Sequence, residues 1–196
     1  IDTAITGSMD FQVTSNIILQ QAMTQLKMDA AVVRVYDPSM KVLKFAVGRG
    51  LHTEALQLTS LRIGEGYAGM AALQKRVVRV PDLQQDQPNF PKFPMFTKEG
   101  FKSYYCVPLI AKGEIKGVME SFHRTIFKPD TEWLDFFETL GGQAAIAIDN
   151  AQLFDNLQKS NQELTQAYDI TLEGWARALE LRDRETEGHT RRVTEL

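Results

Sequence analysis

One long helical pattern at the C-terminal end of the chain constrains its fold most. The pattern begins after Pro129 and Asp130 and continues to about Arg182, whereas an average helix in a globular protein has about 10–14 residues. The residues before it alternate between short β-rich runs and turn signals. A chain with strands first and one very long helix last is predicted to be an α+β domain with a helical extension.

Two pairs of the β-rich runs are joined by short turns. The turns are Asp37-Pro38 and residues 111–114, in which Gly113 is free to adopt a positive φ. Consecutive runs with short connections of this kind are typical of antiparallel neighbours. The predicted strands cover residues 30–36, 42–47, 58–63, 77–80, 104–110 and 115–122.

Two further helices and one long loop are predicted before the long helix. Ser8 offers an N-terminal cap for a helix that reaches about Met28, and residues 70–75 form a short helix entered through the glycines of 64–69. Residues 81–100 hold four of the seven prolines. A loop of this length inside a compact domain is usually functional.

Composition limits the kinds of partner that the chain can have. The chain has 196 residues, of which 43% are hydrophobic, and a net charge of −3 without a long basic block. This favours one well-packed domain with an appendage and argues against nucleic acid and anionic membranes as partners. No apolar run approaches the roughly 18–20 residues of a membrane span. The single cysteine, Cys106, indicates a cytoplasmic location.

Five short motifs occur in a characteristic order along the first three quarters of the chain. They are the strand pair at 30–47, Gly64-Glu65-Gly66, Val80-Pro81-Asp82, Val107-Pro108-Leu109 followed by Gly117-Val118, and residues 142–151. In this order they resemble a GAF domain, a small-ligand sensory module, over residues 8–150. The resemblance implies a six-stranded antiparallel sheet flanked by helices, with a pocket for an unidentified small molecule.

The resemblance also implies where that pocket lies, with residues 81–100 as its lid. Aromatic side chains would cover and wall a flat ligand, and a few polar groups would orient it. In the alternative interpretation, these aromatic side chains pack a ligand-free core beneath a long loop. The pocket candidates are Arg49, Tyr67, Asp82, Phe93, Phe96, Phe101, Tyr104 and Glu120.

Several kinds of GAF chemistry fit this chain poorly. Cys106 lies between strand residues, which favours burial over the attachment of a bilin, and one cysteine is too few for methionine sulfoxide reduction. His52 and His123 stand alone in the sequence, so hydrogen-bonded or solvated histidines are expected in place of metal ligands. The pattern that often accompanies cyclic nucleotide binding is absent. We therefore expect no cofactor in this chain itself.

The helical run 151–182 carries a seven-residue apolar repeat. Such a seam predicts a parallel coiled coil, and a polar Asn161 at position a would set its register. A homodimer through this helix is therefore expected, and the alternative is one helix packed on its own domain or on the next domain. The seam residues are Phe154, Asn161, Tyr168 and Trp175 at position a, with Leu157, Leu164, Thr171 and Ala178 at position d.

The last residues, 183–196, resemble the entry to another family. The motif comprises Arg182-Asp183, Thr186, Gly188-His189 and Arg192-Val193. It resembles the start of HD-GYP domains, which hydrolyse cyclic di-GMP. The resemblance implies that Glu185 and His189 are early ligands of divalent iron or manganese in a complete parent enzyme. In the alternative interpretation, Thr186 caps a new helix and His189 is solvated.

A second motif of HD-GYP enzymes, an adjacent His-Asp pair, is absent from the sequence. Because the motif breaks off, we expect this chain to be a non-enzymatic piece of a longer protein. Our hypothesis is a sensory and dimerisation module that regulates a cyclic di-GMP phosphodiesterase through a helical linker. The alternatives are a ligand-free dimerisation scaffold and a GAF domain with its own redox or metal chemistry.

Overall fold

The structure is a computed structural model that describes residues 9–85 and 93–194. Within these ranges, the side chains of residues 9–12, 14, 93–94 and 180 onward are not described. The chain divides into two units, residues 1–152 and residues 153–196, and each is described by itself.

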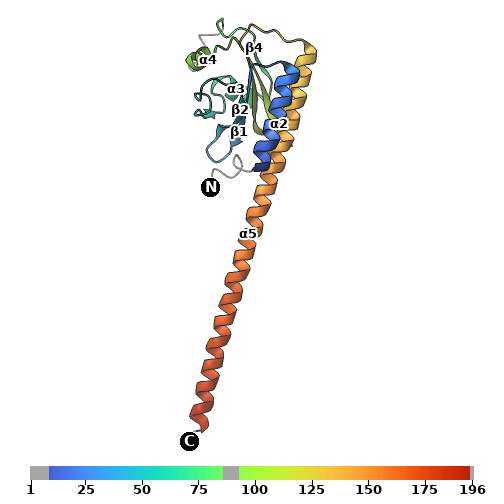
Figure 1. The fold of residues 1–196 in the computed structure, drawn as a ribbon. Coiled ribbons are helices and arrows are strands. Elements are labelled where there is room, and N and C mark those ends of the chain that lie inside the picture. Colours follow the sequence, from blue (N-terminus) through green and yellow to red (C-terminus); the bar gives the residue numbers. More distant parts are fainter. Residues whose placement is uncertain (1–8, 86–92, 195–196) are drawn as a thin grey trace. The chain divides into compact units, whose positions relative to one another are not determined.

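Within the described residues, the first unit contains a sheet and four helices, of which the last continues into the second unit (Figure 1). In chain order the elements are α2 (Met9–Leu26), β1 (Ala30–Asp37), β2 (Val42–Arg49), β3 (Leu61–Arg62), α3 (Gly66–Gln74), β4 (Val78–Val80), α4 (Phe93–Glu99), β5 (Ser103–Ala111), β6 (Glu114–His123) and α5 (Thr131–Thr194).

The six strands form one sheet in the order β3-β2-β1-β6-β5-β4, and every neighbouring pair is antiparallel. This confirms the predicted α+β architecture with a six-stranded antiparallel sheet. The two turns behave as their residues predicted. The Asp37 carboxylate accepts hydrogen bonds from the Ser39 and Met40 backbone N–H groups, and Gly113 adopts a φ of 80°. Local turn chemistry therefore fixes two of the strand connections.

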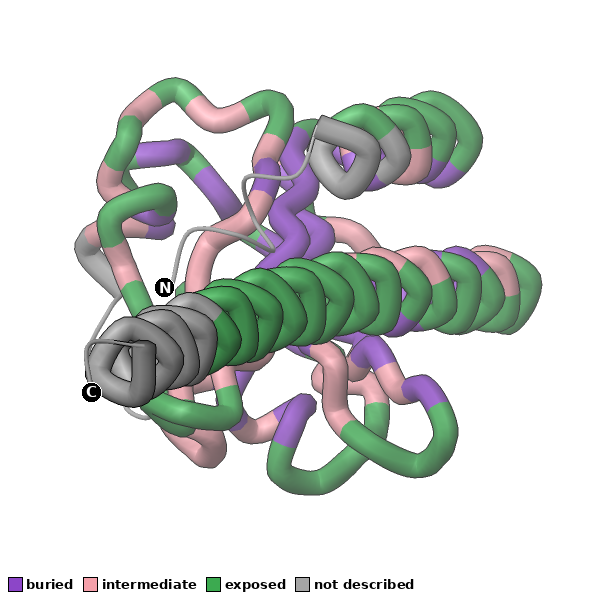
Figure 2. The backbone as a smooth tube through the Cα atoms, turned by 90° about the horizontal axis from the view of Figure 1, so that it is seen from below, coloured by how far each residue is buried: buried purple, intermediate pink, exposed green. Residues whose placement is uncertain are grey.

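Each face of the sheet has its own apolar core. Helix α2 and the part of α5 that belongs to the first unit cover one face, and Figure 2 shows the buried residues concentrated along the strands and the helix surfaces toward them. Leu19, Ala22 and Leu26 recur every three or four residues on α2, so they share the face that packs on the sheet. Helix α3 and α4 cover the other face. The site described below lies on this second face.

A β-bulge interrupts the pairing of β5 with β6. Leu109 pairs with Gly117, but the next residue, Ile110, pairs with Ile115, so Lys116 is an extra residue in β6. Gly117 lies close to β1, and a Cβ atom added to it would be 2.1 Å from the Arg34 backbone oxygen. Only glycine therefore fits at this position.

Three predicted elements differ from the observed ones. The predicted loop at 81–100 contains helix α4, and the third strand is limited to Leu61–Arg62. The last helix passes its predicted end and runs to Thr194. It passes Thr186 without a break, so the interpretation that Thr186 caps a new helix is wrong. The side chains of Glu185 and His189 lie outside the described residues.

The second unit consists of the remaining part of α5. Nearly all of its described side chains are exposed, including large apolar ones: Leu153, Phe154, Leu157, Leu164, Tyr168, Ile170, Leu172, Trp175 and Leu179. Within the described part of the chain, no helix combines the length and the apolar character needed to cross a lipid bilayer.

Candidate ligand site

A buried ion pair lies at the centre of the α3/α4 face of the sheet. Arg34 on β1 and Glu120 on β6 are 1% and 2% exposed, and the Arg34 Nε donates to Glu120 Oε2 at 2.6 Å. β1 and β6 are adjacent antiparallel strands, which brings these two residues close together. Charged groups that are removed from water in this way need partners for all their polar atoms.

The remaining nitrogens of Arg34 hold the segment between β2 and β3. Nη1 donates to the Thr59 backbone oxygen at 2.7 Å, and Nη2 donates to the Leu56 backbone oxygen at 3.2 Å. The Thr59 hydroxyl also donates to the Leu56 oxygen. One guanidinium group therefore ties a loop to the floor of the site. Movement of this loop has to break charge-assisted hydrogen bonds.

The second oxygen of the Glu120 carboxylate is also bonded. Tyr104 on β5 donates its hydroxyl hydrogen to Glu120 Oε1 at 2.9 Å. Burial raises the pKa of Tyr104 well above its usual value, and burial likewise raises the pKa of the Cys106 thiol. Both groups are therefore protonated at neutral pH. Tyr104 is a hydrogen-bond donor here, and Cys106 is a buried, unreactive thiol, as its position between strand residues predicted.

Aromatic rings surround this polar centre. Phe96 on α4 stacks on Tyr104 with 5.7 Å between ring centroids, and it contacts Phe122 edge-on at 5.5 Å. Phe101 stacks on Phe122 at 4.5 Å, and Tyr67 on α3 lies 5.3 Å from Tyr104. The result is a polar triad of arginine, carboxylate and phenol enclosed by flat apolar surfaces. Such a combination suits an aromatic or heterocyclic molecule with a few polar atoms.

The cavity at this site is small in the conformation described. Its volume is about 10 Å³, which is close to the space of a single water molecule. The lining residues come from β1, the loop before β3, β3 itself, α3, α4, β5 and β6: Arg34, Leu56, Thr59, Leu61, Ala68, Met95, Phe96, Tyr104 and Glu120. Phe96 is only 3% exposed. A larger ligand therefore requires α4 to move away from the sheet.

Helix α4 is held in this closed position at its C-terminal end. The Glu99 side chain, 1% exposed, accepts hydrogen bonds from the backbone N–H groups of His52 and Thr53 at 2.8 and 2.7 Å. Burial raises the pKa of Glu99, but the hydrogen bonds from Thr53 and His52 outweigh it and lower this pKa overall. Arg124 bonds the Glu99 backbone oxygen and the Gly50 backbone oxygen. The end of α4 is thus fixed to the loop after β2.

The structure brings together five of the eight predicted pocket residues. Tyr67, Phe96, Phe101, Tyr104 and Glu120 belong to, or line, the α3/α4 face. That they bind a ligand stays a prediction.

The other three candidates are placed differently. Arg49 is exposed and its Nε donates to Asn16 Oδ1 on α2, on the opposite face. Asp82 accepts a hydrogen bond from the Gln84 backbone N–H, which stabilises a turn. The side chain of Phe93 lies outside the described residues. We therefore assign structural roles to Arg49 and Asp82. The sequence around these two residues did not indicate such roles.

Arg34 is the residue that the sequence analysis missed. It stands within the otherwise apolar run Ala30–Tyr36, where strand neighbours on both faces are buried. A charge in a fully buried strand is rare unless it is paired. That signal was present in the sequence, but the partner is 86 positions away and cannot be found from spacing.

Metal-binding chemistry finds no support within the described residues. No group of three or more His, Cys, Asp or Glu side chains is arranged there to hold a metal ion. His52 is exposed. His123 is buried, contacts the Ser121 hydroxyl at 3.2 Å and stacks on Phe127. That neither histidine is a metal ligand stays a prediction.

A six-stranded antiparallel sheet with helices on both faces and a small, partly polar cavity beneath one of them places the chain among small α+β domains. Comparison with known proteins narrows this class. A family profile described as "GAF domain" matches residues 8–149. The chain belongs to the GAF domain family and carries a GAF sensor domain.

Individual relatives agree with this assignment. A methyl sulfide methyltransferase-associated sensor from Methanosarcina acetivorans is 28% identical over 120 residues, which are 61% of this chain but only 12% of that protein. The GAF domain of a phosphoenolpyruvate-protein phosphotransferase from Coxiella burnetii superposes with a TM-score of 0.67 at 18% identity, covering 76% of this chain and 88% of the other.

One solved structure is described as a protein with a GAF domain and a second domain. A GAF domain/HD domain protein from Geobacter sulfurreducens superposes with a TM-score of 0.63 at 13% identity, covering 76% of this chain and 98% of the other. At such identities the similarity establishes the fold alone.

Proposed function

We propose that residues 8–150 form a regulatory sensor that binds an aromatic or heterocyclic small molecule between the sheet and helix α4. The buried triad of Arg34, Glu120 and Tyr104 carries this proposal. Buried ion pairs are often neutral or unfavourable for stability compared with apolar packing. A triad kept beneath an aromatic layer is therefore better explained by recognition than by folding.

The structure also indicates how a ligand would be admitted. Phe96 occupies the space above Tyr104, and α4 has only seven residues. Displacement of α4 would exchange the Phe96 ring for a ligand ring and leave the triad available for polar contacts. Because the same triad holds the loop at Leu56 and Thr59, binding would also change the contacts of that loop.

The test is the release of small molecules from the purified chain. The chain is denatured by heat, and the extract is analysed by mass spectrometry for wild type, Glu120→Gln and the control Glu114→Gln, which alters an exposed carboxylate in the β5–β6 turn. We expect one compound in stoichiometric amount from wild type and the control, and much less from Glu120→Gln. An empty wild-type extract would contradict the sensor proposal.

A ligand-free dimerisation scaffold is the second candidate. The cavity of about 10 Å³ favours it, because a face that is already filled needs no ligand to be stable. An empty extract together with an intact dimer would establish this candidate over the first.

We further propose that the chain forms a parallel homodimer through residues 151–182. The seam residues Phe154, Leu157, Leu164, Tyr168 and Trp175 are between 54% and 70% exposed, and exposed apolar side chains at heptad spacing are stabilised by a partner helix. Asn161 would select a parallel, in-register pair at some cost in stability. Packed helical interfaces of this type can transmit shifts between discrete arrangements.

The dimer test uses two substitutions of equal chemistry on the same helix. Leu164 is at seam position d, whereas Ile170, 71% exposed, is at position c outside the seam. In sedimentation experiments we expect Leu164→Asp to produce monomers and Ile170→Asp to remain dimeric. Equal behaviour of the two variants would exclude the proposed seam.

The regulated partner is proposed to be a cyclic di-GMP phosphodiesterase of the HD-GYP type. Support comes from the motif in residues 183–196 and from the description of the Geobacter relative as a GAF domain/HD domain protein. Glu185 and His189 are four residues apart within helix α5, so they share one helix face. In the complete enzyme they would contribute a carboxylate oxygen and an imidazole nitrogen to divalent metal.

The coding sequence of the parent protein provides the sharpest test of this assignment. An adjacent His-Asp pair followed by a Gly-Tyr-Pro segment is expected within about one domain length of Leu196. A downstream region that encodes a histidine kinase or a methyltransferase-associated sensor would contradict it. The sensor proposal for residues 8–150 would survive that outcome, because it rests on the triad alone.

A further inference from the structure

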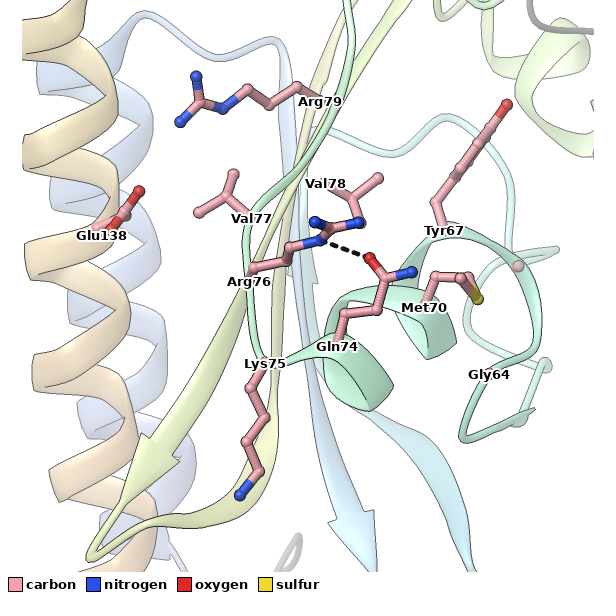
Figure 3. Close-up of a pocket in the computed structure, with 11 residues that line it drawn as sticks. Gly64, Tyr67, Met70, Gln74, Lys75, Arg76, Val77, Val78, Arg79 and Glu138 are labelled. Atoms are coloured by element: carbon pink, nitrogen blue, oxygen red, sulfur yellow. Dashed lines mark hydrogen bonds between the residues drawn. The ribbon is translucent and has the colours of Figure 1, made fainter.

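A second, much larger hollow lies along the edge of the sheet at β4. Its volume is about 890 Å³. Figure 3 shows β4 and the residues before it along the hollow, with α3 on one side and α5 on the other. Apolar walls come from Tyr67, Met70, Val77 and Val78, and polar side chains surround them. We name this hollow the β4 groove. Its lining residues are Gly64, Gly66, Tyr67, Met70, Gln74, Lys75, Arg76, Val77, Val78, Arg79 and Glu138.

The floor of the β4 groove is an open strand edge. β4 is the last strand of the sheet and pairs with β5 on its inner side. Within the described residues, no strand pairs with its outer side. The backbone N–H and C=O groups of an edge strand are a template for another strand. The sheet's other end, β3, has only two residues and does not line this groove.

The charges of the β4 groove are opposite in sign to the charge of the whole chain. Lys75, Arg76 and Arg79 provide three positive charges against the single negative charge of Glu138, a balance of 3 − 1 = +2, while the chain carries −3. The described residues give Arg76 and Arg79 no carboxylate partner. Arg76 Nε instead donates to the neutral Gln74 Oε1 at 2.6 Å, which fixes its direction without neutralising it.

Lys75 is held in a similar way. Its Nζ donates to the Gly113 backbone oxygen in the β5–β6 turn at 2.6 Å. Figure 3 shows Arg79 on the α5 side of the groove and Arg76 on the α3 side, so positive charge lines both walls of the strand edge. Arg76 and Arg79 therefore flank the strand edge on opposite faces of the sheet. Because successive side chains of a strand point to opposite faces, carboxylates on adjacent residues of an added strand are suited to both arginines.

We propose that the β4 groove binds an extended, acidic segment of a partner protein, which adds to β4 as a seventh strand. Its backbone would pair with the outer edge of β4. Two adjacent carboxylates would meet Arg76 on the α3 side and Arg79 on the α5 side, and a neighbouring apolar side chain would contact Met70 and Val78. A second copy of this chain is disfavoured, because pairing β4 with β4 would bring together the net positive charges of two grooves.

The test uses labelled peptides of about six residues, the usual length of a strand, and the full chain. One peptide carries pairs of adjacent glutamates separated by valines, so that carboxylates lie on both faces of the strand, and a second replaces glutamate by lysine. A third is the acidic peptide with alternate backbone nitrogens methylated, which keeps its charge but cannot form a ladder. Fluorescence anisotropy should detect binding of the first peptide alone. Amide hydrogen exchange at Val78–Val80 should slow when that peptide is bound.

Two double variants of equal charge change complete the experiment. Arg76→Glu/Arg79→Glu should weaken binding of the acidic peptide by about tenfold or more. The control Lys102→Glu/Lys128→Glu reverses two exposed charges elsewhere and should leave binding within about twofold of wild type once long-range charge is screened by salt. The proposal is overturned if no peptide binds, if the methylated peptide binds equally well, or if both double variants behave alike. The first outcome would assign the arginines a purely protective role at the sheet edge.

Discussion

The two faces of the sheet differ in the length of the helices that cover them and in the polarity of the residues beneath. On the α2/α5 face, the 18-residue helix α2 and residues 131–152 of α5 pack against mostly apolar strand positions. The α3/α4 face is covered by helices of nine and seven residues and contains a buried ion pair. Long helices with continuous apolar stripes make a permanent core. Short helices above a polar centre form a cover that a bound molecule can displace.

Matched phenylalanine substitutions should produce the largest difference between the faces. Phe137 on α5 is fully buried against Trp133, and Phe96 on α4 is 3% exposed. We expect Phe137→Ala to lower the free energy of unfolding by about 4–5 kcal/mol and Phe96→Ala by about 3 kcal/mol, because a short helix relaxes into the space that is left. Urea denaturation measures both, and equal losses would break the comparison.

Removal of one member of the Arg34–Glu120 ion pair tests the α3/α4 face. Arg34→Met leaves the Glu120 carboxylate buried beside Tyr104 alone, and we expect a loss of about 3–4 kcal/mol. The double variant Arg34→Met/Glu120→Leu should recover most of that loss in the same denaturation experiment. If the double variant is no more stable than the single one, the pair is part of the folding core and the recognition argument fails.

A pH-dependent effect is expected from the α2/α5 face. Burial lowers the pKa of His123 from 6.5 to about 4. The unfolded chain therefore takes up the proton first, so this stabilising contribution is complete above pH 6.5 and is lost as the pH falls toward 4. It amounts to up to about 3 kcal/mol.

Denaturation at several pH values, with two histidine variants, isolates that contribution. His123→Gln should flatten the slope of stability against pH in this window, whereas the exposed His52→Gln should leave the slope as in wild type. An unchanged slope in His123→Gln would show that carboxylates alone govern acid unfolding.

The smallest effect is expected at the clamp between α5 and the β5–β6 turn. Asp149 on α5 pairs with Lys116 at 2.9 Å and with Lys112 at 3.0 Å. The Lys116 hydrogen bond, followed by that of Lys112, lowers the pKa of Asp149. Asp149→Asn should therefore cost less stability than any change above, and that cost should shrink at high salt. Thermal denaturation at two salt concentrations measures it.

The sequence predicted the fold well because the relevant signals are local. Short turns at 37–38 and 111–114 make the strands on either side of them antiparallel neighbours. The spacing of Leu19, Ala22 and Leu26 decides which side of α2 is buried. The exception is α4. Its sequence follows several prolines and reads as a loop, and it becomes helical where Phe96 finds an aromatic surface to pack on.

The candidate site was only partly predictable for a different reason. Aromatic residues and Glu120 were visible as unusual types near the expected pocket. Arg49 and Asp82 were equally plausible polar contacts, and only the tertiary structure sends Arg49 to α2 and Asp82 into a turn. Arg34 gains its meaning from Glu120 on a strand far along the chain, and no local pattern encodes such a pairing.

The extra residue in β6 has a consequence for communication across the sheet. Without the bulge, Lys116 would have the same parity as Glu120 and would share its face. With the bulge, Lys116 reaches Asp149 on α5 instead. Strand β6 thus carries Glu120, whose carboxylate lies beneath the aromatic rings. Four residues earlier the same strand carries Lys116, which pairs with Asp149 on α5. The contact with Glu120 and the contact with Asp149 are therefore only four residues apart on one strand.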